Sequence, residues 1–364
     1  MLENNRFLKT IKGMKRLGGI TLLLIAIIII TVIIQPRFFT AYNLRNILRW
    51  TGLFGILSLG ISFVLITGGI DLSMGSVLGM VGAIATYLMT IGGWPVWIVV
   101  IFIIVLSAFL GLLHGLLVTK LHMQPFVVTL CGLFVYRGMA RFLMDDRTQG
   151  YGNTEFGIKF LAAGRIPSAF WPAGEAPKFF QDWSIPMPFL LLIGLGIILA
   201  IVLNKTVYGQ HLKATGRNES ASRFSGIHTD NVIIVAYIVC STFAGFGGLL
   251  FSLDLNTVQP SSLGNMYEMY AIAGCVVGGV SLRGGEGQIL GVIIGAAIIR
   301  VLYNAINVAG VSTQLEQVVL GLVILIGVAA DEVVRMISAR RKVRESMALA
   351  QKALEESRAA AANR

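Results

Sequence analysis

Polar side chains that stand inside long apolar stretches are the first candidates for chemistry in this sequence. Arg300, Asn304 and Asn307 follow one another at i, i+4 and i+7, a spacing that puts them on one face of a helix. Two amides and one charge suit a polar, uncharged solute that forms hydrogen bonds. The alternative is that the asparagines only join neighbouring helices by hydrogen bonds.

Other polar residues stand at similar places in apolar runs, where ionisable groups are functional candidates by default. Asp71 and Ser73 lie in the glycine-rich sequence GGIDLSMGS, which interrupts an apolar run. No chain of Asp, Glu and His residues that would indicate a proton relay is recognisable. The remaining members of this class are Gln124, Arg137 and Glu316.

A polar segment of 26 residues, 205–230, separates two long apolar runs and contains a complete pattern for a short helix. Asn218 is a good N-cap, because its side-chain oxygen can accept from a free backbone N–H. Glu219 and Arg223 suit the two ends of the helix dipole and are spaced i, i+4, so they can pair. Gly226 is a typical residue just past a helix end.

The predicted helix has about two turns and carries Ala221 and Phe224 on one face. An exposed aromatic side chain on such a helix indicates a partner in the same compartment. The alternative interpretation is a solvated loop.

Composition assigns the chain to the membrane. Of its 364 residues, 55% are hydrophobic and 13% are charged, whereas soluble domains carry about 25% charge. Several runs of 18 or more apolar residues predict an all-α polytopic membrane protein. The 42 glycines fit helices that pack through small residues.

The distribution of the net charge of +11 predicts the topology. Basic residues dominate the tail before Leu17, the segment 205–230 and the tail from Arg335, whereas the loops 145–185 and 253–268 have no basic excess. By the positive-inside rule, both termini and 205–230 are cytosolic and the two loops lie outside. The basic balance is therefore topological, and no nucleic-acid partner is expected.

About ten transmembrane helices are predicted, an even number that agrees with two cytosolic ends. The segment 269–282 is too short for an upright helix across about 30 Å, so it is either re-entrant or a broken helix beside a cavity. We expect a cytosolic tail 1–16, a transmembrane domain 17–336 and a cytosolic tail 337–364. The predicted spans are 17–35, 45–67, 75–91, 95–117, 125–144, 187–204, 231–252, 269–282, 287–309 and 313–336.

Two glycine-rich breaks indicate an internal repeat. Residues 66–84 align with residues 277–297, so that Gly68-Gly69 matches Gly278-Gly279. Broken helices at corresponding places point to a translocation pathway. The alternative is a chance likeness between helices rich in small residues. If the segment 269–282 crosses the membrane the two copies are parallel, and if it does not they are inverted. The residues assigned to the pathway are Asp71, Ser73, Arg300, Asn304 and Asn307.

Catalysis and metal binding find no support in the sequence. It contains no G-x-x-x-x-G-K-[ST] phosphate loop and no G-x-S-x-G elbow. Its four histidines have no metal-binding spacing, and its three cysteines lie in apolar runs without a disulfide pattern. We expect no catalytic residue, no metal and no cofactor in this chain.

Three separated motifs occur in order: ITGGIDLS, YGQHLKATGRNESASRFSGI and TVQPSSLGNMYEMYAIAGCVVGGVSLRGGEGQILGVIIGA. From about Phe39 to Glu332 the chain resembles the permease subunits of bacterial ABC importers for monosaccharides, of the ribose, xylose and galactose type. The resemblance implies an inner-membrane permease that works as a homodimer in the lipid bilayer. It also implies a separate ABC ATP-binding protein on the cytosolic side and a periplasmic sugar-binding protein outside.

The resemblance further implies that Asn218–Gly226 is the coupling helix that docks on the ATPase, and that ATP binds only to that partner. Tyr270 and Glu286 depart from the residues common in relatives, which bears on the identity of the solute. The contacts expected at the coupling helix come from Asn218, Glu219, Ala221, Arg223, Phe224 and Gly226.

Two alternatives remain. The same machinery can carry another small solute, such as a branched-chain amino acid or a nucleoside, and a carboxylate-bearing solute would call for exposed helix N-termini or an arginine in the path. An ion-coupled secondary transporter would instead need a pair of acids inside the membrane, and the sequence reveals none.

Overall fold

The computed structural model describes residues 2–152, 157–170 and 177–310 and isolated positions between 312 and 351, with side chains from Leu17 onward except that of Gln181. Contacts divide the chain into Met1–Leu320 and Gly321–Arg364, and the account below concerns the first unit. Only isolated positions of the predicted span 313–336 and the predicted tail 337–364 are described, and Glu316 lies outside the described residues.

The described residues are mostly helical, and seven of their helices are long and apolar enough to cross a membrane. These helices and the shorter apolar α3 and α12 coincide with nine of the ten predicted spans. At 11 residues, α12 is about 16 Å long, which confirms that this element is too short to cross upright. The long helices are α1 (Leu2–Ile34), α2 (Ala41–Thr67), α4 (Val96–Lys120), α5 (Pro125–Leu143), α8 (Met187–Lys205), α11 (Thr229–Leu255) and α13 (Ile289–Val308). The two shorter ones are α3 (Met74–Thr90) and α12 (Tyr267–Val277).

The ends of α2 show how local sequence sets the helix bounds. Thr40 caps its start, where Oγ1 accepts from the backbone N–H of Asn43 at 3.4 Å. Gly68 ends it with a φ of +85°, a conformation that glycine adopts without a Cβ penalty. Proline stands at the first turn of α5 and of α8, where its missing N–H costs no hydrogen bond.

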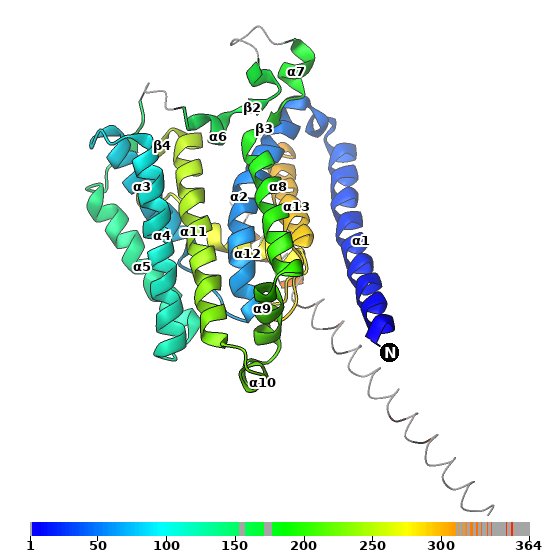
Figure 1. The fold of residues 1–364 in the computed structure, drawn as a ribbon. Helices are drawn as coiled ribbons and strands as arrows, with labels where there is room; N and C mark the ends of the chain where they lie inside the picture. The colour runs from blue at the N-terminus through cyan, green and yellow to red at the C-terminus, as the bar shows by residue number, and fades with distance from the viewer. Residues whose placement is uncertain are drawn as a thin grey trace, which may run out of the picture. The chain divides into compact units, whose positions relative to one another are not determined.

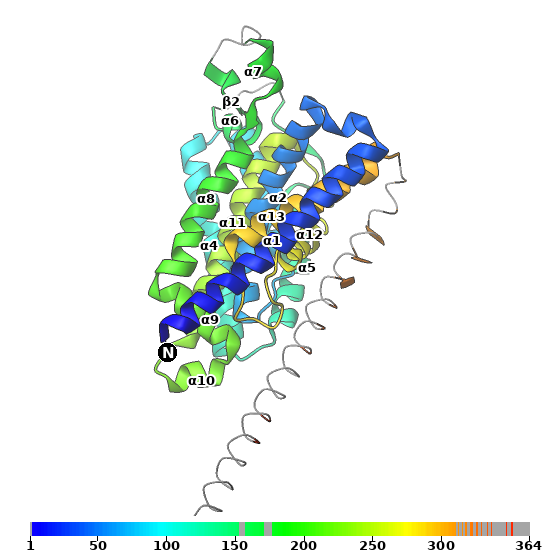
Figure 2. The same cartoon turned by 90° about the vertical axis from the view of Figure 1, so that its right-hand side faces the viewer.

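Helix α2 is the centre of the first unit (Figure 1). It packs against α8, α11, α12 and α13, and every residue from Thr51 to Ile66 is buried. By contrast, α1 lies on the outside of the bundle and crosses α13 obliquely, as the rotated view shows (Figure 2). The middle of α2 is therefore enclosed by protein on all sides.

Short elements gather at the two ends of the bundle. At one end lie α6 (Lys159–Ala163), α7 (Lys178–Asp182) and two antiparallel ladders. The first ladder pairs β1 (Gln149–Gly150) with β4 (Thr257–Val258), and the second pairs β2 (Arg165–Ile166) with β3 (Ile185–Pro186). Two short 3₁₀ helices complete the set, η1 (Pro36–Phe39) and η2 (Ser168–Phe170).

The other end of the bundle carries α9 (Val207–Arg217) and α10 (Glu219–Phe224). Thr206 caps α9, because its Oγ1 accepts from the N–H of Gly209 at 3.3 Å. The segment 205–230 thus holds two helices rather than one, and α9 was missed because its polar composition resembles that of a loop. Helix α9 buries Gly209, Leu212 and Thr215 along one face, which is the 3.6-residue period of an amphipathic helix.

Candidate functional site

The predicted short helix is present as α10, with the predicted caps. The Asn218 Oδ1 accepts from the N–H of Ala221 at 2.9 Å. Arg223 Nη2 lies 3.2 Å from Glu219 Oε1, which confirms the i, i+4 pair. Gly226 follows the helix end with a φ of +84°, as predicted for a residue past a C-terminus. The six-residue helix is slightly shorter than the two turns expected.

Arg223 also fixes α10 to the first turn of α11. Its Nη2 lies 2.8 Å from Asp230 Oδ1 and donates to Thr229 Oγ1 at 3.1 Å. The second carboxylate oxygen of Asp230 lies 2.6 Å from Lys120 Nζ at the end of α4. These pairs join α10 to α11, and α11 in turn to the end of α4. On the preceding helix, burial and the neighbouring Arg217 lower the pKa of Lys213.

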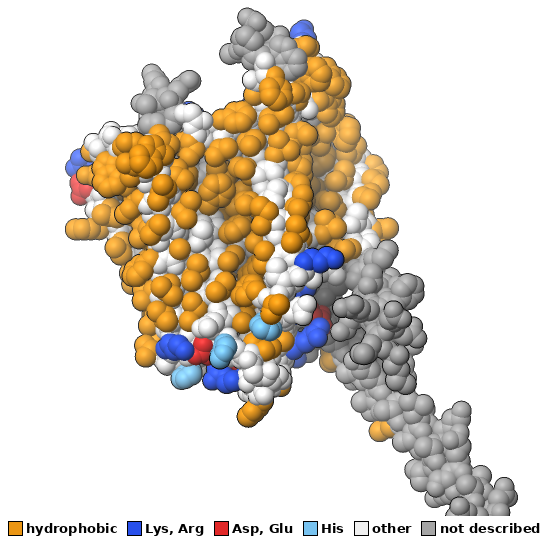
Figure 3. Space-filling model, viewed as in Figure 1, with side chains coloured by type: hydrophobic (Ala, Val, Ile, Leu, Met, Phe, Trp, Pro, Cys, Tyr) orange, Lys and Arg blue, Asp and Glu red, His pale blue; other side chains and the backbone are white. Residues whose placement is uncertain are grey.

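Phe224 is the most exposed large apolar side chain at this site, with 94% of its surface accessible. Ala221 is exposed as well, and Ile227 is half-buried. On the face in Figure 3, most of the charged and histidine side chains gather at the lower end, where Figure 1 places α10, below a broad apolar surface. Phe224 is thus an apolar group among polar ones, outside the apolar belt.

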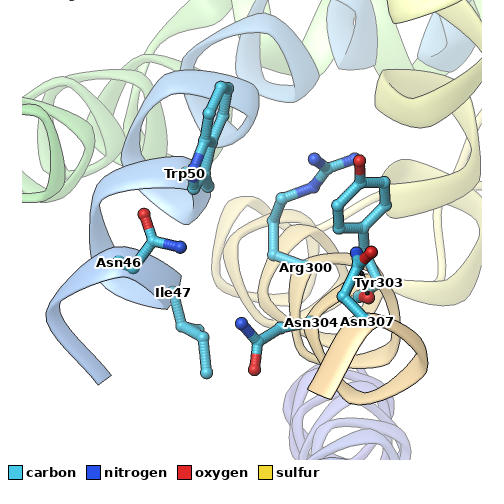
Figure 4. Close-up of a pocket in the computed structure, with 7 residues that line it drawn as sticks. All are labelled: Asn46, Ile47, Trp50, Arg300, Tyr303, Asn304 and Asn307. Atoms are coloured by element: carbon cyan, nitrogen blue, oxygen red, sulfur yellow. Dashed lines mark hydrogen bonds between the residues drawn. The ribbon is translucent and has the colours of Figure 1, made fainter. Parts of the chain in front are cut away.

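A separate site lies between α2 and α13, where a cavity of about 170 Å³ opens (Figure 4). From α2 it is lined by Asn46, Ile47 and Trp50. From α13 come Arg300, Tyr303, Asn304 and Asn307. The structure therefore brings the three predicted residues of α13 together in one cavity, with a tryptophan and a further amide facing them.

Arg300 is only 5% exposed, and its guanidinium is surrounded by aromatic rings. The guanidinium carbon lies 3.7 Å from the ring centroid of Phe54, 4.7 Å from that of Tyr270 and 4.9 Å from that of Tyr303. Phe54 continues this aromatic cluster with centroid distances of 4.7 Å to Tyr267 and 5.1 Å to Phe251. Tyr270, a departure from relatives noted above, is therefore part of the arginine's environment.

The two asparagines of α13 differ in their partners. The amide of Asn304 exchanges two hydrogen bonds with that of Asn43 on α2, at 2.8 and 2.7 Å. Asn307 is exposed and donates to the carbonyl of Tyr303 on its own helix at 3.0 Å. Asn304 joins two helices and lines the cavity at the same time, so the two interpretations made from sequence both apply to it.

Asp71 and Ser73 lie at a different site and do not line this cavity. Asp71 is fully buried. Its Oδ1 accepts from the backbone N–H and the hydroxyl of Ser73 at 2.8 and 2.6 Å, and its Oδ2 accepts from the Cys240 thiol at 3.4 Å. The carboxylate thus fixes Ser73, the residue before the first turn of α3, and joins this segment to α11.

Two further buried groups beside Asp71 were missed by sequence reasoning. His114 Nε2 lies 2.9 Å from the Tyr136 hydroxyl, and the buried Nδ1 of His114 has no hydrogen-bond partner among the described residues. A methyl group on Gly132 would lie 2.8 Å from His114 Nε2 and 3.2 Å from Ser73 Cβ, so these groups are neighbours. The structure thus brings His114 and Tyr136 next to Ser73, the hydrogen-bond partner of Asp71.

A second buried acid, Glu268, was also missed. It is 4% exposed at the start of α12, whereas the sequence analysis placed it in the outer loop 253–268. Nearby, Arg137 donates to the carbonyls of Pro260 and Leu263, which fixes the loop before α12 against α5. These contacts join residues more than a hundred positions apart.

The two glycine-rich breaks end their helices in the same way. Gly68 N–H donates to Leu65 O at 2.9 Å and Gly69 N–H to Val64 O at 3.1 Å. Gly279 N–H donates to Val276 O at 2.9 Å and Val280 N–H to Cys275 O at 2.8 Å. Both are Schellman caps, with a φ of +85° at Gly68 and at Gly279. Gly68 and Gly279 thus hold the same position of the cap, whereas the sequence alignment pairs Gly68 with Gly278.

These features define a multi-pass helical membrane protein with a polar cavity between its helices and a capped polar helix at one end, an arrangement that suits a membrane transport subunit. Residues 43–328 match the family described as branched-chain amino acid transport system, permease component, and the chain belongs to this family.

Curated relatives align along most of their own length. The ribose import permease protein of Haemophilus influenzae is 33% identical over 85% of this chain and 90% of its own. That of Bacillus subtilis is 35% identical over 87% and 93%. The xylose transport system permease protein of Escherichia coli is 29% identical over 88% and 93%. No solved structure is a significant match to the chain.

Proposed function

We propose that this chain is the transmembrane permease subunit of an ATP-driven sugar importer in the bacterial inner membrane. It would form the pathway for a monosaccharide delivered by a periplasmic binding protein. The observation that carries the proposal is the near full-length similarity to permeases named for ribose and xylose import. The galactose and methyl galactoside import permease protein of Escherichia coli, 28% identical, adds a third sugar.

In this proposal α10 is the coupling helix. Phe224 and Ala221 supply an apolar contact for a cleft in the ATPase, while Arg223 holds the helix on α11. Closure of two ATPase domains displaces α10 in each of two permease copies. The energy comes from the different affinities of the partners for the outward-open and inward-open states. The chain itself needs no catalytic residue, metal or cofactor, and ATP belongs to the partner.

The remaining architecture follows from the same proposal. The chain has ten transmembrane helices with an internal repeat, both termini and residues 205–230 in the cytosol, and the loop 145–185 in the periplasm. It assembles as a homodimer. The similar Schellman caps at Gly68 and Gly279 support the repeat, and the polar end around α10 supports the orientation by the positive-inside rule.

The cavity between α2 and α13 is the proposed binding position of the solute. Amides and aromatic rings suit a sugar, because amides bind hydroxyl groups and rings cover the apolar faces of a pyranose or furanose. Arg300 also fits a second candidate, a carboxylate-bearing solute such as a branched-chain amino acid, which the family description names. Uptake experiments distinguish the two.

The test is uptake by proteoliposomes that contain the permease, its ATP-binding protein and loaded binding protein. We expect ATP inside the vesicles to drive uptake of ribose, xylose or galactose, and excess leucine not to compete. Uptake of leucine instead of sugars would favour the second candidate. Uptake that needs an ion gradient and is indifferent to ATP would overturn the proposal in favour of a secondary transporter.

A further inference from the structure

Three backbone segments from distant parts of the chain meet next to α10. The first is the end of α2 at Ile66–Gly68, and the second is the loop 281–287 between α12 and α13. The third is the end of α9 at Gly216 and Arg217. A direct hydrogen bond joins the first two, from the N–H of Gly285 to the carbonyl of Ile66 at 2.8 Å.

Glycine is required where these segments touch. A methyl group on Gly216 would overlap the carbonyl oxygen of Ile66 and lie 2.5 Å from the N of Gly285. A methyl group on Gly284 would lie 2.7 Å from the oxygen of Gly216 and 2.7 Å from the N of Gly68. The neighbouring atoms belong to the backbone, so no change of rotamer relieves these contacts.

The position of this contact in the chain shows which elements it connects. Gly216 and Arg217 directly precede Asn218, the N-cap of α10. Gly68 begins the first break, the segment between α2 and α3 that contains Asp71. Gly284 and Gly285 lie in the second break, the segment between α12 and α13, and α13 carries the cavity residues. One contact therefore connects the coupling helix with both breaks.

We propose that Gly216, with Gly68, Gly284 and Gly285, forms a joint that transmits the displacement of α10 to α3 and α13. The inference rests on the proposed function of α10. Closely packed interiors are hardly compressible, and backbone in direct contact leaves no side chain to absorb a shift. As long as these backbone contacts persist, a displacement of α9 and α10 must also move the end of α2 and the loop 281–287.

The first experiment compares Gly216→Ala with Gly194→Ala in proteoliposomes of the complete complex. Both glycines are helical, so the gain in helix propensity is matched, but a methyl group on Gly194 meets nothing within 4 Å. We expect Gly216→Ala to keep basal ATP hydrolysis and to lower uptake per ATP hydrolysed by about tenfold. Uptake per ATP hydrolysed by the Gly194→Ala complex should stay within about twofold of the value for the unmodified complex. An assembled Gly216→Ala complex with unchanged uptake per ATP overturns the joint.

The second experiment needs no substitution and so does not depend on folding of a variant. Amide hydrogen exchange of the unmodified complex is compared with and without a non-hydrolysable ATP analogue. We expect changes in α10 together with changes at Gly68, Gly69 and Gly285, and none in the ladder of β1 and β4 at the opposite end of the bundle. Changes confined to α9 and α10 overturn the joint, whereas no change at α10 overturns the proposed coupling role and the joint with it.

Discussion

Asn43 and Asn304 hold each other by two hydrogen bonds, each side-chain amide donating to the oxygen of the other at 2.8 and 2.7 Å. The pair joins α2 to α13 beside the cavity, and Asn43 is only 9% exposed. Removal of Asn304 leaves the Asn43 side-chain oxygen without its hydrogen bond, while the Asn43 amide nitrogen still donates to the carbonyl of Phe38 at 2.9 Å. The contribution of Asn304 to stability and its proposed role in transport can therefore be measured separately.

Asn304→Leu should lower the free energy of unfolding by about 1–3 kcal/mol, the cost of leaving the buried side-chain oxygen of Asn43 without a hydrogen bond. Replacement of both residues by leucine should recover only part of this stability, since no amide oxygen is then left without a partner but the hydrogen bond from Asn43 to the carbonyl of Phe38 is lost. Uptake should remain low in both variants. Thermal unfolding of the purified permease and uptake in proteoliposomes measure the two effects.

Asn307→Leu is the matched control for stability, because the Asn307 side chain bonds only to its own helix. It should unfold at nearly the same temperature as the unmodified protein. If leucine at both Asn304 and Asn307 leaves uptake unchanged, these residues serve packing alone and the cavity is not the solute path.

Phe224→Ala should uncouple ATP hydrolysis from transport. A side chain that is 94% exposed in the free subunit contributes little to folding, so the permease should insert and unfold normally. Loss of a buried aromatic anchor weakens an interface by about 2 kcal/mol or more. Stimulation of ATP hydrolysis by loaded binding protein should fall. Ser220→Ala, on the same helix, is the control that should keep it.

Glu219→Arg tests the same helix by charge. It places a like charge opposite Arg223 and a positive charge at the positive end of the helix dipole. Uptake and stimulated ATP hydrolysis should both decrease. If Phe224→Ala and Glu219→Arg both keep full stimulation and uptake, α10 is an exposed turn without a coupling role.

Arg300→Lys should weaken the aromatic cluster at the cavity. The planar guanidinium stacks on Phe54 at 3.7 Å, and an ammonium group lacks this planarity. The variant should lose about 1–2 kcal/mol of cation–π stabilisation and lower the apparent affinity for the solute. Thermal unfolding and the concentration dependence of uptake check these effects. Unchanged values for both would assign Arg300 no role at the cavity.

Cysteine labelling tests the orientation. Arg165 and Arg217 are both exposed, and they lie in the predicted periplasmic loop and cytosolic segment respectively. In a background without Cys131, Cys240 and Cys275, an impermeant thiol reagent added to spheroplasts should modify Arg165→Cys and spare Arg217→Cys. The reverse pattern contradicts the orientation proposed here.

Sequence patterns were sufficient where the contacts are local. The N-cap at Asn218, the pair of Glu219 with Arg223 and the stop at Gly226 all lie within nine positions, and all three are present. The spacing of Arg300, Asn304 and Asn307 likewise predicted one shared face, because helical periodicity alone determines it. The docking of α10 and the role of the cavity stay predictions.

Contacts between distant helices were beyond these patterns. His114, Tyr136 and Cys240 belong to three helices, and only packing brings the first two together and the third to Asp71. Asn43 lies 261 positions from Asn304. The cap at Gly279 was likewise not predicted, since backbone hydrogen bonds, and not residue identity, show which of the two glycines ends α12.

The short ladder of β1 and β4 fastens the loop after α5 to the loop after α11 at the end opposite α10. Two side-chain contacts reinforce it, Tyr151 to Ser252 at 3.0 Å and Lys159 to Asn256 at 3.1 Å. These contacts hold the two loops together at this end of the bundle. If the cavity binds the solute as proposed, we expect that end to widen between α2 and α13, where a hydroxyl of the solute can replace one amide of the Asn43–Asn304 pair.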